Sequence, residues 1–448
     1  MRSLSAVRRR MTLVEKELRE LTASRAYWLM LLVVGALVGH AFITSVNIYA
    51  EASGIGGGPA ALSQGLSPLE GFVVPVLGAY DIAATLLFPF VVIRLFANET
   101  QTGALTLSLQ MPTSFNTVIA AKAVALLLGW IVAGTAGMAA LHLWETMGGH
   151  LYAPETHAVL LGHLLRGVLT IGIGAAAAAL SASAASAAII ALTFTLGTWA
   201  LDYVAAARGG AISEIAAYTP SSALRVFEHG ELRVATILIL LVLGLGGVAV
   251  AAVWMRVGDR VGVRVWRVAG VTAVTASLCV GFAQIRASSD VSEDRRNSFP
   301  RADELALRQI TQPLVVTVYL AAEDPRLVDL ERILTKLERT MPGVRVEYGA
   351  KSRSGLFEKP GDHYGEIWYD LGGKRAMSRS STQEIILETI YELAGRRPPT
   401  PVAEPSYSGY PLAARPVLAP WIFFVIWPVC VLAAWWWIRK PASKRGSR

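Results

Sequence analysis

The sequence contains eight apolar segments that are each long enough to cross a lipid bilayer as a helix. They cover residues 26–49, 71–95, 118–141, 158–180, 184–204, 234–256, 266–286 and 417–438. A helix needs about 20 apolar residues to cross the hydrocarbon core, where each backbone polar group must be satisfied within the protein. The chain is also 53% hydrophobic and only 17% charged, as expected for an integral membrane protein. We therefore predict a polytopic α-helical membrane protein with eight transmembrane helices.

Lysine and arginine residues are distributed unevenly between the two ends of these segments. Residues 1–25 carry seven of them, residues 256–267 carry four and residues 439–448 carry five, whereas the loops 51–70 and 143–157 carry none. Cytoplasmic loops are enriched in lysine and arginine. We therefore predict a multi-pass protein of the bacterial cytoplasmic (inner) membrane with both termini in the cytoplasm. The net charge of +8 then reflects topology, and no nucleic acid partner is expected.

A long polar interruption, residues 94–122, separates the second apolar segment from the third. The two segments beside it form a helical hairpin, which brings this stretch to the cytoplasmic face together with the termini. Glu99, Gly103 and Pro112 frame a short apolar set. The set consists of Leu105, Leu107 and Leu109, between Arg94 and Lys122 at the water boundary. An apolar set in this position requires a protein partner.

Two further stretches adjoin the membrane segments. Residues 11–25 carry apolar residues at helical spacing, which predicts an amphipathic helix lying in the cytoplasmic interface. The loop 205–233 is predicted to be extracytoplasmic, although its three arginine residues weaken the charge pattern. It contains Tyr218-Thr-Pro220, followed by Phe227 and Gly230 shortly before the sixth span. Pro and Gly also end loops for ordinary turn reasons.

The stretch from Glu99 to Pro112 resembles the cytoplasmic coupling segment of type-2 ABC exporter permeases. In that family a Glu, three residues, a Gly, a short leucine-rich run and a Pro lie where the second span turns into the third. The family often has Thr directly after the Gly, whereas this chain has Ala104. The helix 11–25 is similar to the elbow helix of these permeases, and the loop 218–232 is similar to the approach to the last span of their core.

The resemblance implies a six-span permease core in residues 26–256, with an elbow helix in residues 1–25 and a coupling segment in residues 97–116. It implies cytosolic ABC ATPase subunits as partners, a second permease subunit that is identical or related, and membrane lipid around them. The residues implied to contact the ATPase are Glu99, Gly103, Leu105, Leu109 and Pro112. ATP and Mg²⁺ would be bound by the partner, and no cofactor is expected in this chain.

Residues 287–416 have the pattern of a small extracytoplasmic α/β domain between the seventh span, within residues 257–286, and the eighth span at 417–438. The domain is flanked by a polar stalk at 287–311, in which a helix is expected from Ala302, and by a Pro-rich stalk at 396–416. Between them lies a β-α-β-β-β-α order, thioredoxin-like in its layering. This domain contains no cysteine, which excludes thioredoxin-type redox chemistry. The basic tail 439–448 follows the last span.

The sequence YGEIWYDLGGKR and the helical stretch STQEIILETIYELAG after it carry a second resemblance. They are similar to the N-terminal part of the extracytoplasmic auxiliary subunit of gliding-motility-type ABC transporters. In those systems the auxiliary protein is usually separate and larger, whereas here its first portion precedes a closing transmembrane helix. The resemblance implies a permease fused to part of that subunit.

Few residues suggest chemistry within the chain itself. No Walker A pattern occurs, so ATP hydrolysis is expected in a partner and the chain is not expected to be an enzyme. Histidine and carboxylate residues concentrate between the third and fourth spans, but their spacing matches no standard metal motif, and no metal site is predicted. The group that would form such a site is His142, Glu145, His150 and His157.

Asp81 is an ionisable residue within the second span. A charged side chain at the bilayer centre costs about 2.5–3.5 kcal/mol on insertion scales, so Asp81 either faces the bundle interior or lies closer to the headgroups than the span limits suggest. The first alternative makes Asp81 an intramembrane polar site. Arg166, in the fourth span, is expected to extend its side chain to the outer surface.

These observations predict the membrane-spanning permease subunit of an ATP-driven ABC transporter, of the exporter type. The alternative is a membrane-anchored scaffold or sensor whose outer domain binds an envelope partner. Eight spans are more than an anchor requires, which favours the transporter. A third class, an intramembrane metalloenzyme, would depend on the histidine group. The cargo is not indicated by the sequence.

Overall fold

The computed structural model describes residues 2–55, 67–101, 114–208, 211–256, 258–321, 324–341, 343–349, 363–400, 407, 409–412 and 414–439. Within these residues, eight helices are long and apolar enough to cross a membrane. They are α2 (Arg25–Ala50), η2 (Leu69–Val73) with α4 (Val74–Gln101), α6 (Phe115–Ala133) with α7 (Thr135–Thr146), α8 (Ala153–Leu180), α9 (Ala184–Arg208), α12 (Val234–Trp254), α13 (Val261–Ala283), and α17 (Ala419–Trp421) with η3 (Ile422–Ile426) and α18 (Trp427–Arg439). The predicted polytopic helical class is confirmed, and the number of these helices equals the number of predicted spans.

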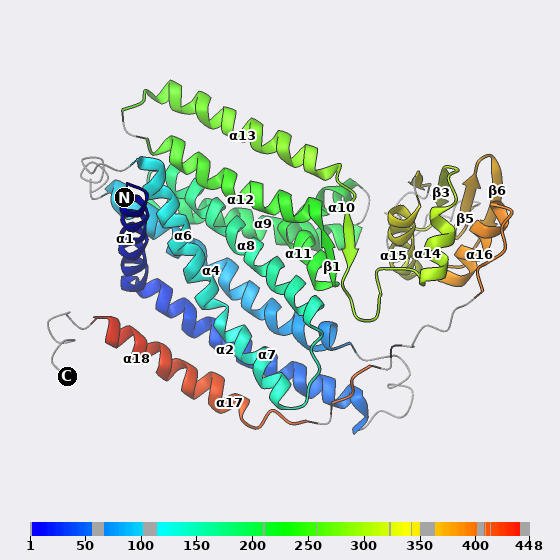
Figure 1. The fold of residues 1–448 in the computed structure, drawn as a ribbon, viewed down its shortest axis with the longest axis horizontal. Coiled ribbons are helices and arrows are strands. Elements are labelled where there is room, and N and C mark those ends of the chain that lie inside the picture. Colours follow the sequence, from blue (N-terminus) through cyan, green and yellow to red (C-terminus); the bar gives the residue numbers. More distant parts are fainter. Residues whose placement is uncertain are drawn as a thin grey trace, which may run out of the picture.

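The long helices run side by side in one bundle, with the small α/β domain beyond one of its ends (Figure 1). Helix α8 is central, because it packs against α4, α6, α9 and α12. Helix α18 returns from the α/β domain and packs on α2. By contrast, α13 packs on α12, and none of its 23 residues, all of which the structure describes, is buried. The apolar surface of α13 is therefore available to lipid or to another subunit.

Small residues allow α8 and α12 to approach each other at the level of their backbones. A Cβ atom added at Gly172 would lie 2.2 Å from the carbonyl oxygen of Gly244, and one added at Gly244 would lie 2.6 Å from the carbonyl oxygen of Val168. Such close approach is the usual role of small residues between membrane helices, since burial alone does not drive helix association in lipid. Gly172 thus lies at a direct backbone contact between α8 and α12.

Replacing Gly172 with valine is therefore expected to separate α8 from α12 and to lower the free energy of unfolding by about 3 kcal/mol or more, because overpacking against a backbone cannot be relieved by a rotamer change. The measurement is the unfolding midpoint of the purified protein in mild detergent. Gly197→Val is the matched control, since Gly197 lies in α9 with no atom within 4 Å of an added Cβ. Equal midpoints for the two variants would contradict this packing.

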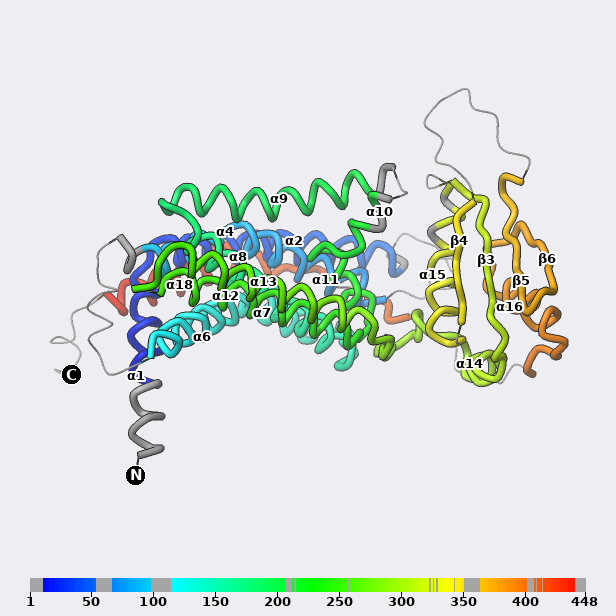
Figure 2. The backbone as a smooth tube through the Cα atoms, turned by 90° about the horizontal axis from the view of Figure 1, so that it is seen from above, coloured from blue at the N-terminus to red at the C-terminus, as the bar shows by residue number. Residues whose placement is uncertain are grey.

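The α/β domain consists of a four-stranded sheet with helices packed on it. Its elements are α14 (Arg301–Arg308), β3 (Leu314–Val318), α15 (Pro325–Thr340), β4 (Val344–Tyr348), β5 (Ile367–Leu371), β6 (Lys374–Ser378) and α16 (Gln383–Leu393). The strand order is β4-β3-β5-β6, in which β3 pairs parallel with β4 and antiparallel with β5 (Figure 2). From β3 onward the elements follow the predicted order β-α-β-β-β-α.

The segment predicted as the first stalk is more ordered than its polar composition suggests. Its first residues form strand β2 (Ser288–Asp290), which pairs antiparallel with β1 (Glu231–Arg233), directly before α12. Phe299 and Leu307, the latter in α14, are fully buried in the core of the α/β domain. The segment therefore connects the domain to the bundle at a defined point, and the helix expected from Ala302 within it corresponds to α14.

Candidate functional site

The first candidate site is the place where helix α1 (Arg2–Ala23) crosses the bundle. Helix α1 packs against α6, α4 and α2 at the end of the bundle farthest from the α/β domain (Figure 1). The helices α4 and α6 flank residues 102–113, which lie outside the described residues. The amphipathic helix predicted from the sequence is thus attached to both helices that border the predicted coupling segment.

A buried ion pair makes this attachment specific. Lys122 Nζ, on α6, lies 2.7 Å from Glu17 Oε2 on α1, and both side chains are fully buried. Lys122 Nζ also donates a hydrogen bond to the backbone carbonyl oxygen of Leu95 on α4, at 3.3 Å. Charges removed from water need such partners, because an unpaired buried charge costs several kcal/mol. A single ammonium group therefore connects α1, α4 and α6.

The predicted coupling residues belong to the neighbouring segment. Glu99 lies in the last turns of α4, where the structure describes the backbone. The others lie outside the described residues: Gly103, Leu105, Leu109 and Pro112. Their contacts with an ATPase remain a prediction. Lys122, which the sequence places at the water boundary, is instead fully buried because Glu17 supplies its counter-charge.

The second candidate site is a group of polar side chains within the bundle, between α4 and α8. Asp81 on α4 faces His163 and Arg166 on α8: His163 Nδ1 and Arg166 Nε each lie 3.7 Å from Asp81 Oδ1. Thr85 Oγ1 donates a hydrogen bond to the same oxygen, at 3.2 Å. All four side chains are buried. Asp81 thus faces the bundle interior, as one of the two sequence alternatives requires.

The position of Arg166 shows why its side chain does not extend to the membrane surface. Arg166 lies near the middle of the 28-residue helix α8. With a rise of 1.5 Å per residue, the helix ends are each about 20 Å away, which is beyond the reach of an arginine side chain. Only 3% of the Arg166 surface is exposed. The expected extension to the outer surface was wrong, because Asp81 on a neighbouring helix provides the negative charge.

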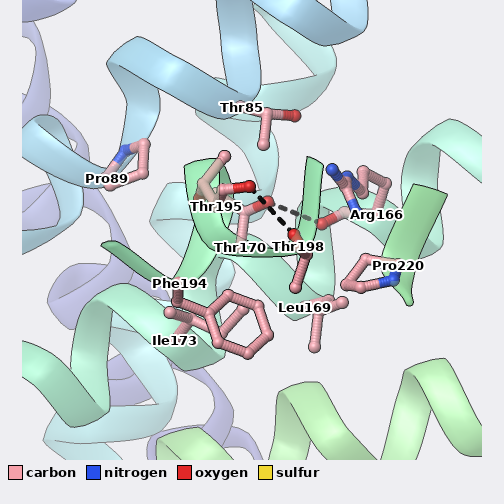
Figure 3. Close-up of a pocket in the computed structure, with 10 residues that line it drawn as sticks. All are labelled: Thr85, Pro89, Arg166, Leu169, Thr170, Ile173, Phe194, Thr195, Thr198 and Pro220. Carbon is pink, nitrogen blue, oxygen red and sulfur yellow. Dashed lines mark hydrogen bonds between the residues drawn. The ribbon is translucent and has the colours of Figure 1, made fainter. Parts of the chain in front are cut away.

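A small cavity adjoins this group where α4, α8 and α9 meet (Figure 3). Its volume is about 10 Å³, and four threonine residues line it beside Arg166: Thr85, Thr170, Thr195 and Thr198. A site of this volume has room for one water molecule and excludes a larger ligand. Within the part of the chain that the structure describes, Arg166 Nε has no hydrogen-bond partner. One water molecule in this cavity would supply such a partner.

The four residues of the candidate metal group do not converge. His150 Nε2 lies 3.0 Å from Glu293 Oε2, and its ring stacks on Tyr410 with the centroids 3.6 Å apart. His142, Glu145 and His157 are exposed. In the described ranges no group of three or more His, Cys, Asp or Glu side chains is placed to hold a metal ion. His150 therefore connects the bundle to the segment leading to the α/β domain.

Sequence reasoning identified Asp81 but missed its neighbours His163 and Arg166. It also missed the separate buried pair of Glu17 with Lys122. One signal was present for α8: His163 and Arg166 lie three residues apart on one helical face within an apolar span. An ionisable pair at that position indicates a polar partner inside the bundle.

A scan against protein-family models and searches of curated proteins and of solved structures find no match to the chain.

Proposed function

We propose that the chain is the membrane-spanning permease subunit of an ATP-driven ABC transporter of the exporter type, coupled to a separate cytosolic ATPase. The observation that carries the proposal is the buried contact of Lys122 with Glu17 and with the Leu95 carbonyl group. It joins the elbow-like helix to the two helices that border the coupling-like segment. A permease needs such a connection, since force from an ATPase enters through this segment.

The connection offers a physical route from the segment to the bundle interior. Pro89 lies inside α4, between Leu95 and the polar group around Asp81. A proline in a helix removes the hydrogen bond to the carbonyl group four residues earlier, here that of Thr85, and permits bending at that position. Movement of the inner part of α4 with α1 and α6 would therefore act at Thr85 and Asp81. These residues face α8, the central helix.

The remaining parts of the proposal follow from the charge pattern and the exposed helices. Both termini and residues 97–116 lie in the cytoplasm, and residues 287–416 lie outside the bacterial inner membrane. Two such subunits, identical or related, form one transport path with two ATPase subunits below them. The unburied surfaces of α9, α12 and α13 offer room for this second subunit and for lipid. ATP and Mg²⁺ act in the partner.

The test is affinity purification of the intact protein from its native membrane in mild detergent, followed by mass spectrometry. A cytosolic ABC ATPase is expected to co-purify, and Glu99→Ala and Leu105→Asp are each expected to reduce its recovery at least about tenfold, which corresponds to 1.4 kcal/mol of binding free energy. Glu388→Ala, at an exposed position on α16, is the matched control and should leave recovery unchanged.

Two results would contradict the proposal. The first is the absence of any ATPase while envelope proteins bound to the α/β domain are recovered, which would support the scaffold or sensor instead. The second is an ATPase that co-purifies equally with wild type, Glu99→Ala and Leu105→Asp. In that case an ATPase binds elsewhere, and the residues 97–116 do not form the coupling contact.

A further inference from the structure

A cleft of about 840 Å³ separates one end of the bundle from helix α15 of the α/β domain. On the bundle side its wall comes from the end of α2, the turn η2, the helix α11 (Pro220–Glu228) and strand β1. Helix α11 and strand β1 lie at the end of the bundle that faces α15 (Figure 1). We call this space the interdomain cleft. Its volume lies within the range of about 300–1,000 Å³ found for small-molecule sites.

Positive charge dominates the interdomain cleft. Six of its lining residues are lysine or arginine and three are aspartate or glutamate, which gives six minus three, a formal charge of +3. The basic residues are Arg225, Arg233, Arg296, Arg332, Lys336 and Arg339, and the acidic residues are Glu70, Glu231 and Asp294. The carboxylates therefore cannot neutralise all the cations around them.

The three carboxylates are already paired with part of the basic set. Glu231 is shared by Arg233, at 2.6 Å, and by Arg339, at 3.1 Å. Arg296 is paired with both others, Glu70 at 2.5 Å and Asp294 at 2.9 Å. These contacts hold the two walls together, since Arg339 belongs to α15 and Glu231 belongs to β1. All three carboxylates that line the interdomain cleft are therefore already paired, and none is left for Arg332 or Lys336 on α15.

Two cations on α15 have no acidic partner in the part of the chain that the structure describes. Among the described residues no carboxylate lies within 4.0 Å of Arg332 or Lys336. Lys336 Nζ donates a hydrogen bond to Gln383 Oε1, at 3.2 Å, and lies 5.7 Å from the centre of the Phe299 ring. Burial lowers the pKa of Lys336 below its ordinary value, despite the attraction of Asp290. The positive charge of Lys336 is thus only partly balanced by the neutral groups that contact it, Gln383 and Phe299.

The basic residues of α15 form a continuous surface toward the cleft. Arg332, Thr335, Lys336 and Arg339 occupy positions i, i+3, i+4 and i+7, which lie on one face of a helix. Arginine and lysine side chains bind phosphate oxygens through charge-assisted hydrogen bonds. The Thr335 hydroxyl group, by contrast, already donates to the backbone carbonyl oxygen of Glu331. The bundle side adds apolar contacts from Ile48 and Val226.

We propose that the interdomain cleft binds a phosphate-bearing anion, which Arg332 and Lys336 of α15 contact directly. Its position favours a membrane lipid as the source of the phosphate. Strand β1 is followed at once by the apolar helix α12, and the turn η2 opens another candidate span, so the cleft lies at the ends of helices long enough to cross a membrane. Phospholipid headgroups occupy this level of a bilayer. The site does not depend on transport or on an ATPase.

The experiment uses the full-length protein, purified and stripped of lipid in a neutral detergent, and native mass spectrometry as the readout. The probes are phosphatidylglycerol, phosphatidylcholine and glycerol 3-phosphate. Phosphatidylglycerol is expected to bind at least about tenfold more tightly to wild type than to the double variant Arg332→Gln with Lys336→Gln, a difference that corresponds to 1.4 kcal/mol. Arg308→Gln, an exposed position on α14 outside the cleft, is the matched control and should bind as wild type.

The probes also distinguish the source of the phosphate. Tight binding of phosphatidylglycerol without competition from glycerol 3-phosphate supports a lipid ligand, whereas competition at equal concentration supports a soluble phosphate ester in the same site. Equal binding by wild type and the double variant would overturn the proposal, as would equal affinity of wild type for phosphatidylglycerol and phosphatidylcholine. Both substitutions keep hydrogen-bonding side chains at positions that are not part of the core, so the variants are expected to fold. Circular dichroism spectra of wild type and variants test this expectation.

Discussion

Replacing Lys122 with alanine is expected to lower the free energy of unfolding by about 3–5 kcal/mol, because it leaves the Glu17 carboxylate buried without its counter-charge. The Glu17 side chain is fully buried, so water cannot take the place of the ammonium group. The contact with the Leu95 carbonyl group is lost as well, which frees α4 from α1 and α6. The measurement is unfolding by titration with a denaturing detergent, followed by tryptophan fluorescence.

A second ion pair on α1 provides the control for Lys122. Arg19 and Glu15 are one turn apart and 2.5 Å from each other, but their side chains are 79% and 59% exposed. Exposed pairs at this spacing contribute about 0.3–0.5 kcal/mol, so Arg19→Ala should change stability little. The double variant Glu17→Leu with Lys122→Met should recover most of the loss, because it removes both buried charges. Equal effects of Lys122→Ala and Arg19→Ala would show that the Lys122 pair is exposed in solution.

The second large effect is expected at Arg166. Substitution by methionine, which keeps the length of the side chain, is expected to cost about 3–5 kcal/mol, since the buried Asp81 carboxylate then loses the Arg166 guanidinium group that lies 3.7 Å from it. The distances of 3.7 Å are longer than hydrogen bonds, so the attraction between the charges is what is lost. Unfolding in detergent, followed as for Lys122, measures this effect.

Its control is the ion pair of Arg267 with Asp259, where the two side chains are 44% and 25% exposed. Arg267→Met should change stability by no more than about 1 kcal/mol. The double variant Asp81→Asn with Arg166→Met should be more stable than Arg166→Met alone, because it removes the uncompensated carboxylate. If the double variant were the less stable of the two, Asp81 would not depend on Arg166 for its charge balance.

The sequence predicts the helical bundle well because each span carries its own signal. A run of about 20 apolar residues has few alternatives to a membrane helix. The strands of the α/β domain were similarly visible, since Leu314–Val318 and Val344–Tyr348 are rich in β-branched residues. Local composition suffices for features of this kind.

The buried charges were not predictable in the same way, because each pair joins residues far apart in the chain. Glu17 and Lys122 are 105 residues apart, and no periodicity in the sequence relates them. From the sequence alone, Arg166 and Lys122 are each expected to extend toward water. Their buried acidic partners lie on other helices, which the sequence does not identify. Strands β1 and β2 were missed for a related reason: each has three residues, too few for an alternating pattern to be recognised.

The pairing of β1 with β2 also constrains the order in which the chain can be assembled. Strand β1 ends at Arg233, before α12, and β2 begins at Ser288, after α13, so the two strands meet only when both intervening helices are in place. A chain grows from its N-terminus during synthesis, and its parts fold in that order. If α13 failed to insert, Ser288–Asp290 would lie on the opposite side of the membrane from Glu231–Arg233, and the two strands could not pair. The pairing of β1 with β2 therefore requires α12 and α13 to lie antiparallel, with both strands at the same end of the bundle.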